Sequence, residues 1–253
     1  MKILLTNDDG IDSPGLKTIY QFLSKIHEVI VVAPSVERSG ASNSLTFHNN
    51  VIIRKYDSNH YTCSGTPADC VHRTLHHLID GFMPDIVVSG INLGPNLGTD
   101  IIYSGTAAAA RQAAVMGVPG VAVSVTAFQE PFYFDRAAAF ISENIDAFYA
   151  NWNSEHFINI NVPSLEADNT GVMITRPSRR FYKETMDQVI MKEDDAIEVT
   201  LDISGISHDD KYGSDCYAVD RGMISISPVF IQPVIDEKSQ QLYKSIFNRN
   251  SHG

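Results

Sequence analysis

Two adjacent carboxylates, Asp8 and Asp9, follow the first apolar segment of the chain. That segment, residues 3–6, is apolar or β-branched throughout and shows no alternation, a pattern typical of a buried strand in a parallel sheet. Ligands of open α/β sheets bind beyond the carboxyl ends of such strands, where this pair falls. Because the two negative charges repel each other, a cation or a hydrogen-bond network must compensate them. The competing interpretation is a helix cap in a loop, a role for which residues 12–14, Asp-Ser-Pro, are also suited.

Two further polar loops follow predicted parallel strands and carry oxygen donors. Residues 28–34 form an apolar run that is followed by Ser39, and residues 85–89 form another that is followed by Asn92. If these strands are neighbours of the first one, both side chains converge with the aspartates. Carboxylate, hydroxyl and amide oxygens suit a hard divalent cation, whereas zinc would ordinarily require His or Cys, and no HxH or HExxH pattern occurs. The sequence therefore predicts one Mg²⁺ or Mn²⁺ ion bound by Asp8, Asp9, Ser39 and Asn92.

The long loop after residue 89 ends in groups that favour an anion. Ser104, Gly105 and Thr106 lead directly into an alanine-rich segment that we expect to be a helix. Backbone N–H groups at a helix N-terminus bind phosphate oxygens with help from the helix dipole, and the Asn96 amide adds a donor without negative charge. Plain capping of the helix by Ser104 or Thr106 is the alternative. A cation site beside an anion site predicts phosphate binding by Asn96, Ser104, Gly105 and Thr106.

A parallel sheet is needed to bring these loops together. Strand-like and helix-like patterns alternate along the first part of the chain, which predicts an α/β fold with a mostly parallel central sheet. From about residue 171, strand-like segments separated by polar turns predict a C-terminal β-rich extension. We expect a single domain over residues 1–253, with a parallel-sheet core in 1–165 and an extension or oligomerisation arm in about 171–253. The individual elements expected are a hairpin joining 51–53 to 61–63, strands at 172–175, 195–200 and 223–228, and a final helix at 238–249.

Charge and cysteine content narrow the partners and the compartment. The formal net charge of −11 argues against a stable complex with nucleic acid. Three cysteines without a CxxC pair suit a reducing cytoplasm and provide neither a disulfide framework nor a zinc site. No apolar run reaches membrane-spanning length, and the N-terminal residues lack the pattern of a signal peptide. We expect a cytoplasmic protein without a membrane or nucleic-acid partner.

Longer motifs extend over nearly the whole chain. They are TNDDG at 6–10, APSVERSGASNSLT at 33–46, GTPADCV at 65–71, PDIVVSGINLGPNLGTDIIYSGTAAAA at 84–110, GVPGVAVS at 117–124 and SDCYAVDRGMISISPV at 214–229. In these blocks and in their order the chain resembles the SurE family (survival protein E), nucleotidases that release phosphate from nucleoside 5′- and 3′-monophosphates. It departs from the family at Ala108 or Ala109, where Gly is usual, and at Gln112, where Glu is common. Residues 168–210 match only loosely.

The resemblance implies a Rossmann-like three-layer core and homodimers or homotetramers built by exchange of C-terminal segments. It assigns Asp8, Asp9, Ser39 and Asn92 to the metal, and Asn96, Ser104, Gly105 and Thr106 to the phosphate. We expect Asp8 or Asp9 to orient an attacking water or to accept its proton. Nucleoside monophosphates are the expected substrates, and polyphosphate is a candidate for an exopolyphosphatase side activity. No leaving-group acid is evident; water or a side chain near residues 214–215 is the candidate.

A non-catalytic phosphate-sensing module of the receiver type is the main alternative, because receiver domains also place an acidic pair after their first strand. They additionally need an acceptor Asp at the end of a central strand and a Lys at a later strand end. Here residues 89–92 read Ser-Gly-Ile-Asn, and residues 124–126 offer no Lys. A phosphatase that uses Asp8 as a nucleophile is a further alternative, but its usual signature separates the two Asp by one residue.

Overall fold

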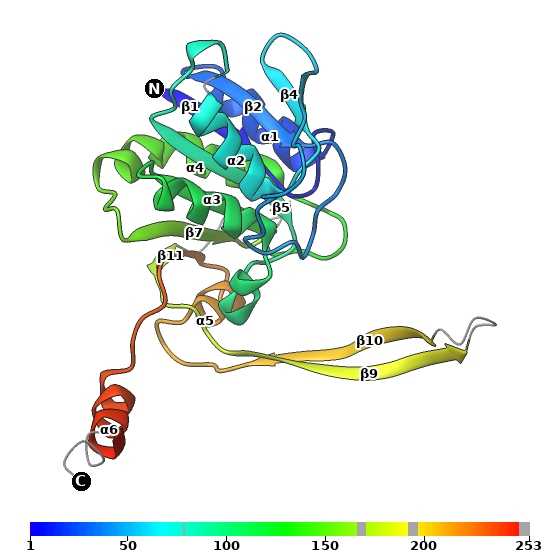
Figure 1. The fold of residues 1–253 in the computed structure, drawn as a ribbon, viewed down its shortest axis with the longest axis vertical. Helices are drawn as coiled ribbons and strands as arrows, with labels where there is room; N and C mark the ends of the chain where they lie inside the picture. Colours follow the sequence, from blue (N-terminus) through cyan, green and yellow to red (C-terminus); the bar gives the residue numbers. More distant parts are fainter. Residues whose placement is uncertain (78, 166–170, 192–196, 248–253) are drawn as a thin grey trace.

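The computed structural model describes residues 1–77, 79–165, 171–191 and 197–247. These residues form an α/β body from which a long β-hairpin and a C-terminal helix project (Figure 1). None of the helices within these ranges combines the length and the hydropathy that a membrane crossing requires.

A nine-stranded sheet is the middle layer of the body, in the order β3-β4-β2-β1-β5-β6-β7-β11-β8. Its strands are β1 (Lys2–Thr6), β2 (Glu28–Pro34), β3 (Ile53–Lys55), β4 (His60–Cys63), β5 (Ile86–Leu93), β6 (Gly120–Val125), β7 (His156–Val162), β8 (Val172–Ile174) and β11 (Ile224–Phe230). The six neighbouring strands β4, β2, β1, β5, β6 and β7 are parallel to one another. β3 pairs antiparallel with β4, and β11 pairs antiparallel with β7. The observed sheet confirms the predicted α/β fold with a mostly parallel central sheet.

Helices cover both faces of the sheet and complete three layers. They are α1 (Pro14–Leu23), α2 (Pro67–His77), α3 (Gly105–Val115) and α4 (Phe134–Ala150). α1 packs with α4 on one face, and α2 packs with α3 on the other. In β1, Ile3 and Leu5 point into the core under α1 and α4, while Leu4 points into the core under α2 and α3. A strand buried on both faces needs apolar residues at every position, which explains the unbroken apolar run.

The start of α1 decides between the two interpretations of the first loop. Ser13 is the N-cap, because its hydroxyl oxygen accepts a hydrogen bond from the Leu16 N–H at 3.4 Å, and Pro14 occupies the first turn. Asp12 instead forms an exposed ion pair with Lys17 at 2.9 Å. The carboxylates of Asp8 and Asp9 are therefore not used as the cap of this helix.

The C-terminal part contributes both to the main sheet and to the projections. β8 and β11 complete the nine-stranded sheet, whereas β9 (Arg180–Met191) and β10 (Ile197–His208) pair antiparallel as a separate sheet. We refer to this hairpin as the arm. α5 (Asp215–Asp220) lies between the arm and β11 in the chain, and α6 (Glu237–Phe247) has no buried residue. Figure 1 shows the arm and α6 extending away from the body in different directions.

Most of the individual elements expected from the sequence are observed. The predicted hairpin is observed as β3 and β4, but its first strand is Ile53–Lys55 and not the predicted 51–53. The strands predicted at 172–175 and 223–228 are confirmed as β8 and β11. The strand predicted at 195–200 is the start of the longer β10, although residues 195 and 196 lie outside the described residues. The final helix predicted at 238–249 is α6, and residues 248 and 249 also lie outside the described residues. Sequence reasoning missed β9, α5 and the short 3₁₀ helices η1 (Ile79–Gly81) and η2 (Gly98–Ile102). The division into a core and an extension stays a prediction.

Candidate active site

Three neighbouring strands bring the predicted metal ligands to one edge of the sheet. β1 pairs in parallel with β2 on one side and with β5 on the other. Because the three strands run in the same direction, the loops that carry Asp8 and Ser39 leave the sheet at the edge where β5 ends. β5 continues to Leu93, so Asn92 lies near the end of the strand and not in the loop that the sequence predicted after residue 89. The adjacency of these strands, on which the predicted site depends, is therefore confirmed.

Asp8 is almost completely buried, with 3% of its surface exposed. The Thr106 hydroxyl donates a hydrogen bond to one carboxylate oxygen, and the Thr106 N–H donates to the other at 3.1 Å. Burial raises the pKa of Asp8, and the hydrogen bonds from Thr106 oppose that rise. Since Thr106 lies in the first turn of α3, the N-terminus of this helix faces Asp8. Both Thr106 donors hold the Asp8 carboxylate here, an arrangement that the anion-site prediction did not anticipate.

Gly105, the first residue of α3, allows this close contact. A Cβ at this position would lie 2.8 Å from the Asp8 Cβ and 2.9 Å from its Oδ2 atom. Any larger residue would displace either the helix N-terminus or the carboxylate. Gly105 therefore fixes how closely α3 approaches Asp8.

Asp9 is half-buried and accepts a hydrogen bond from the Leu93 N–H at 3.3 Å. Burial, together with the charges of Asp8 and Glu37, raises the pKa of Asp9 to about 7. Within the part of the chain that the structure describes, no basic side chain forms an ion pair with either aspartate. The two carboxylates are thus a pair of adjacent acids without a protein counter-charge.

Ser39, in the loop after β2, and Asn92, near the end of β5, provide neutral oxygens. The Ser39 hydroxyl is exposed and donates to Glu37 Oε1 at 2.8 Å. The Asn92 amide nitrogen donates to the Gly94 carbonyl oxygen at 2.8 Å, which orients the side chain and leaves its amide oxygen free to face another group.

A cavity of about 630 Å³ opens at this edge of the sheet and collects most of the predicted residues. Its polar lining includes five of them, namely Asp8, Ser39, Asn92, Asn96 and Ser104. Asp9, Gly105 and Thr106 do not line the cavity. Thr106 is hydrogen-bonded to Asp8, and Gly105 allows the N-terminus of α3 to approach it closely. The remaining lining is largely apolar or aromatic and was not predicted: Leu93, Pro95, Tyr103, Phe128, Tyr182 and Ile206, with Gly40 and Asp100.

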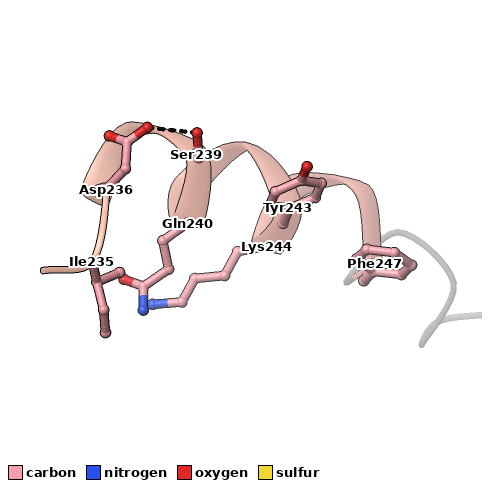
Figure 2. Close-up of a pocket in the computed structure, with 7 residues that line it drawn as sticks. All are labelled: Ile235, Asp236, Ser239, Gln240, Tyr243, Lys244 and Phe247. Carbon is pink, nitrogen blue, oxygen red and sulfur yellow. Dashed lines mark hydrogen bonds between the residues drawn. The ribbon is translucent and has the colours of Figure 1, made fainter. Parts of the chain in front are cut away.

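A second hollow, of about 540 Å³, lies on the projecting helix α6. All of its lining comes from residues 235–247, and Figure 2 shows them along a single helical segment, with Ser239 hydrogen-bonded to Asp236. None of the predicted site residues belongs to it, so it is a surface of the projection and no part of this site.

Asn96 is held by a buried cluster of polar side chains. The Asn96 N–H donates to Asn161 Oδ1 at 2.8 Å, and its carbonyl oxygen accepts from the amides of Asn159 and Asn161 at 2.8 and 3.0 Å. The Asn96 side chain donates to Ser124 Oγ at 2.8 Å. Sequence reasoning missed these supporting residues, although two asparagines in the apolar strand β7 are a signal, because buried amides need partners.

Ser104 caps α3, which was the alternative to a phosphate role. Its Oγ atom accepts a hydrogen bond from the Ala107 N–H at 2.9 Å. The hydroxyl proton remains available to a ligand in the cavity, so capping and anion binding are compatible at this residue.

Ser214 and Asp215, considered for a leaving-group acid, are not among the residues that line the cavity. Asp215 is fully buried, and its carboxylate accepts hydrogen bonds from the N–H groups of Gly98 at 2.7 Å and Ser178 at 2.9 Å. Ser214 is the N-cap of α5. The structure therefore gives these residues a structural role, and the choice between them and water as the leaving-group acid stays a prediction.

The donor set fits a hard divalent cation. Two carboxylates without a counter-charge, a hydroxyl and an amide oxygen are the ligands that Mg²⁺ and Mn²⁺ accept, with water completing the coordination. Among the described residues, no group of three or more His, Cys, Asp or Glu side chains forms a metal site. This agrees with a site that has only two acidic ligands and needs neutral oxygens.

Comparison with known proteins identifies the family. The sequence profile described as "Survival protein SurE" matches residues 3–184. The chain belongs to the SurE family. The protein named 5′-nucleotidase SurE from Citrifermentans bemidjiense is 37% identical over 249 residues, covering 97% of this chain and 98% of that protein. The same name is borne by a protein of Rubrobacter xylanophilus that is 39% identical, with 91% of this chain and 92% of that protein covered.

A solved structure also matches over the full length. The crystal structure of the SurE protein from Aquifex aeolicus superimposes with a TM-score of 0.82 at 32% identity, covering 98% of this chain and 100% of that chain. The resemblance inferred from the sequence motifs is thereby confirmed, and so is the fold.

Proposed function

We propose that the protein is a divalent-metal-dependent nucleotidase that hydrolyses nucleoside 5′-monophosphates, and also 3′-monophosphates, to nucleoside and phosphate. The relatives named 5′-nucleotidase SurE support the reaction. The single observation that carries the mechanism is the adjacent pair Asp8 and Asp9, for which the described residues provide no basic partner, with Asp8 in the lining of the cavity. The other acid of the lining, Asp100, is paired with Arg180. The competing receiver-like sensing module has no observation of its own in its favour.

In this proposal Asp8, Asp9, Ser39 and Asn92 hold one Mg²⁺ or Mn²⁺ ion. Such an ion, when bound, supplies charge neutralisation for the phosphate dianion and activation of a water molecule. Asp8 is fixed by Thr106 and serves as the rigid ligand. Asp9 is less buried and carries a single long hydrogen bond from Leu93, which suits it to orient the attacking water or accept its proton.

Phosphate oxygens would be bound at the opposite side of the acidic pair. Ser104 and Asn96 both line the cavity, and the Ser104 hydroxyl proton and the second proton of the Asn96 amide would donate to the phosphate without adding negative charge. Because these donors are fixed before the substrate arrives, they stabilise the charge of the transition state without reorganisation. Phosphate-ester hydrolysis is extremely slow without catalysis, so such preorganisation is required.

Three further features remain proposals for this chain. We propose a homodimer or homotetramer formed through the C-terminal segments, a role supported by large apolar side chains exposed on α6, among them Leu242, Tyr243 and Phe247. Polyphosphate hydrolysis is a proposed side activity of the same site. The expected location is the cytoplasm.

A panel of substrates and metals tests the proposal. The protein is treated with a chelator and assayed with AMP, GMP, their 3′-isomers and short polyphosphate, each without metal and with added Mg²⁺ or Mn²⁺. We expect release of phosphate from the nucleotides only when metal is restored. Binding of nucleotide without hydrolysis of any substrate would favour a sensing module, and full activity after chelation would contradict the proposed cofactor.

A further inference from the structure

The end of the arm that adjoins the body, with Arg180, Tyr182 and Ile206, forms one wall of the site cavity, and we refer to it as the foot of the arm. Tyr182 on β9 and Ile206 on β10 both line the cavity, and they are direct partners in the register of the two strands. Cross-strand partners lie on the same face of a hairpin, so one face of the arm is turned toward the site. The neighbouring Phe181, paired with Ser207, points to the opposite face.

A buried polar contact fastens this foot to the body. Arg180 forms an ion pair with Asp100 of η2, and the Tyr182 hydroxyl donates to the second carboxylate oxygen of Asp100. The two charged side chains are only 7% and 15% exposed, so the contact is shielded from solvent. Burial and the Asp100 carboxylate raise the pKa of Tyr182, which keeps the phenol protonated and donating.

The same segment of the body carries the predicted phosphate residues. η2 lies between Asn96 and Ser104 in the chain, and the buried Asp215 carboxylate joins its first residue, Gly98, to Ser178 just before the arm. The position of the arm foot and the position of the phosphate loop are therefore fixed by shared contacts.

The rest of the apolar lining stands on the body side of the cavity. Phe128 and Tyr103 are 68% and 64% exposed, although both border the cavity. The Phe128 ring lies over Gly94, where a Cβ would sit 3.6 Å from a ring carbon. A phosphate group gains nothing from aromatic walls, whereas a nucleobase stacks on them, and each such contact strengthens binding.

We propose that Tyr182 and Ile206, at the foot of the arm, form the nucleoside-binding wall of the site and determine its preference for nucleotides over other phosphate monoesters. This inference rests on the proposed nucleotidase function and adds to it a specificity element contributed by the arm. The phosphate is bound at the strand-end loops, and the base lies between the arm foot and the exposed aromatic residues of the body. Asp100 and Arg180 are positioning residues, because they hold the wall in place.

The test compares a nucleotide with the same phosphate ester lacking its base. kcat/KM is measured with AMP and with ribose 5-phosphate for the wild type, Tyr182→Ala, Tyr182→Phe, Ile206→Ala and the control Phe181→Ala. We expect Tyr182→Ala to lower the AMP-to-ribose-5-phosphate ratio about tenfold, mainly through KM for AMP. Ile206→Ala lowers the ratio by a smaller factor, Tyr182→Phe retains it because the ring remains, and Phe181→Ala leaves it at the wild-type value.

Two outcomes overturn the inference, and a binding measurement separates it from the proposed function. An equal loss on both substrates in Tyr182→Ala, or the same change in ratio for Phe181→Ala, would show that the wall does not contact the base. If Tyr182→Ala does not fold, as judged by its thermal unfolding, Ile206→Ala alone decides. If the wild type hydrolyses neither substrate, the proposed function fails. The wall is then tested by calorimetry, as the affinity of the metal-loaded protein for AMP. We expect Tyr182→Ala to weaken that affinity most, Ile206→Ala less, and Tyr182→Phe and Phe181→Ala not at all.

Discussion

The two ends of the site cavity are built from different parts of the molecule. At one end, the loops after β1 and β2 present Asp8 and Ser39, and the last residues of the adjacent strand β5 present Asn92. The N-terminus of α3 holds Asp8, and the Gly94 carbonyl oxygen orients Asn92. At the other end, side chains of the separate arm sheet, Tyr182 and Ile206, complete the lining. The polar end depends on the topology of the body, whereas the apolar end depends on a hairpin fastened to the body by a few contacts.

This difference predicts different consequences of mutation. Polar groups at the strand ends are each held by hydrogen bonds to a neighbouring segment, and in the proposed mechanism they act directly on the metal and the phosphate. A change in one of them should therefore lower turnover. Apolar groups on the arm act through surface contact, so a change there alters affinity for one part of the substrate. At the polar end we expect the effect of substitution to decrease in the order Asp9, Gly105, Asn161 and Ser104, each relative to a residue of the same type elsewhere in the chain.

The largest effect is expected for Asp9→Asn. Loss of one acidic ligand and proton acceptor should lower kcat by about 10²–10⁴-fold. The metal-free variant should nevertheless unfold at a higher temperature than the metal-free wild type, because Asp9 is partly buried beside Asp8 and its charge is unfavourable there. Asp12→Asn is the control, since Asp12 is an exposed residue paired with Lys17. Wild-type turnover in Asp9→Asn would remove this residue from the mechanism.

Gly105→Ala should have the next largest effect. The added Cβ would lie 2.8 Å from the Asp8 Cβ, so the helix N-terminus or the carboxylate must move. A displacement of this size is expected to reduce kcat/KM about tenfold to a hundredfold. Gly205→Ala on the arm is the matched control, because a Cβ there would meet no atom within 4 Å. Equal kinetics for the two variants would show that the approach of α3 to Asp8 is not critical.

Asn161→Asp tests the cluster that holds Asn96. The substitution removes the amide that donates to the Asn96 carbonyl oxygen and replaces it with an acceptor. We expect a loss of about 1–3 kcal/mol in the free energy of unfolding and a severalfold lower kcat/KM. Chemical denaturation and steady-state kinetics measure the two effects. Asn153→Asp is the control, because Asn153 is exposed and its side-chain oxygen accepts hydrogen bonds from the Glu155 N–H and from His156, as a carboxylate also can. It should change stability by no more than about 0.5 kcal/mol and leave the kinetics unaltered.

The smallest effect is expected for Ser104→Ala, compared with Ser214→Ala. Both residues are N-caps, of α3 and α5 respectively, and each substitution should cost about 1 kcal/mol of stability. Only Ser104 borders the cavity, so only its substitution should raise KM, by a few fold. A similar KM in both variants would reduce Ser104 to a helix cap.

The polar end could be predicted from the sequence because its signals are local. An apolar run without alternation fixes a buried parallel strand, and such strands place their following loops at one edge. The sequence predicted part of β10 as a strand but gave no signal that the arm reaches the site. β9 and β10 are unpaired with the main sheet, and their contact with the site depends on the distant residue Asp100. The role of Thr106 also required the structure, because the sequence alone does not distinguish a hydroxyl that binds phosphate from one that binds Asp8.

The most direct test of the central claim is a titration of the chelator-treated protein with Mn²⁺, followed by calorimetry and by AMP hydrolysis in the same samples. We predict one ion bound per chain, phosphate release that rises in parallel with occupancy, and loss of both in Asp8→Asn and Asp9→Asn. Hydrolysis of AMP at the full rate without bound metal, or unchanged Mn²⁺ binding in the two variants, would contradict the assignment of Asp8 and Asp9 as the acidic ligands of a catalytic metal.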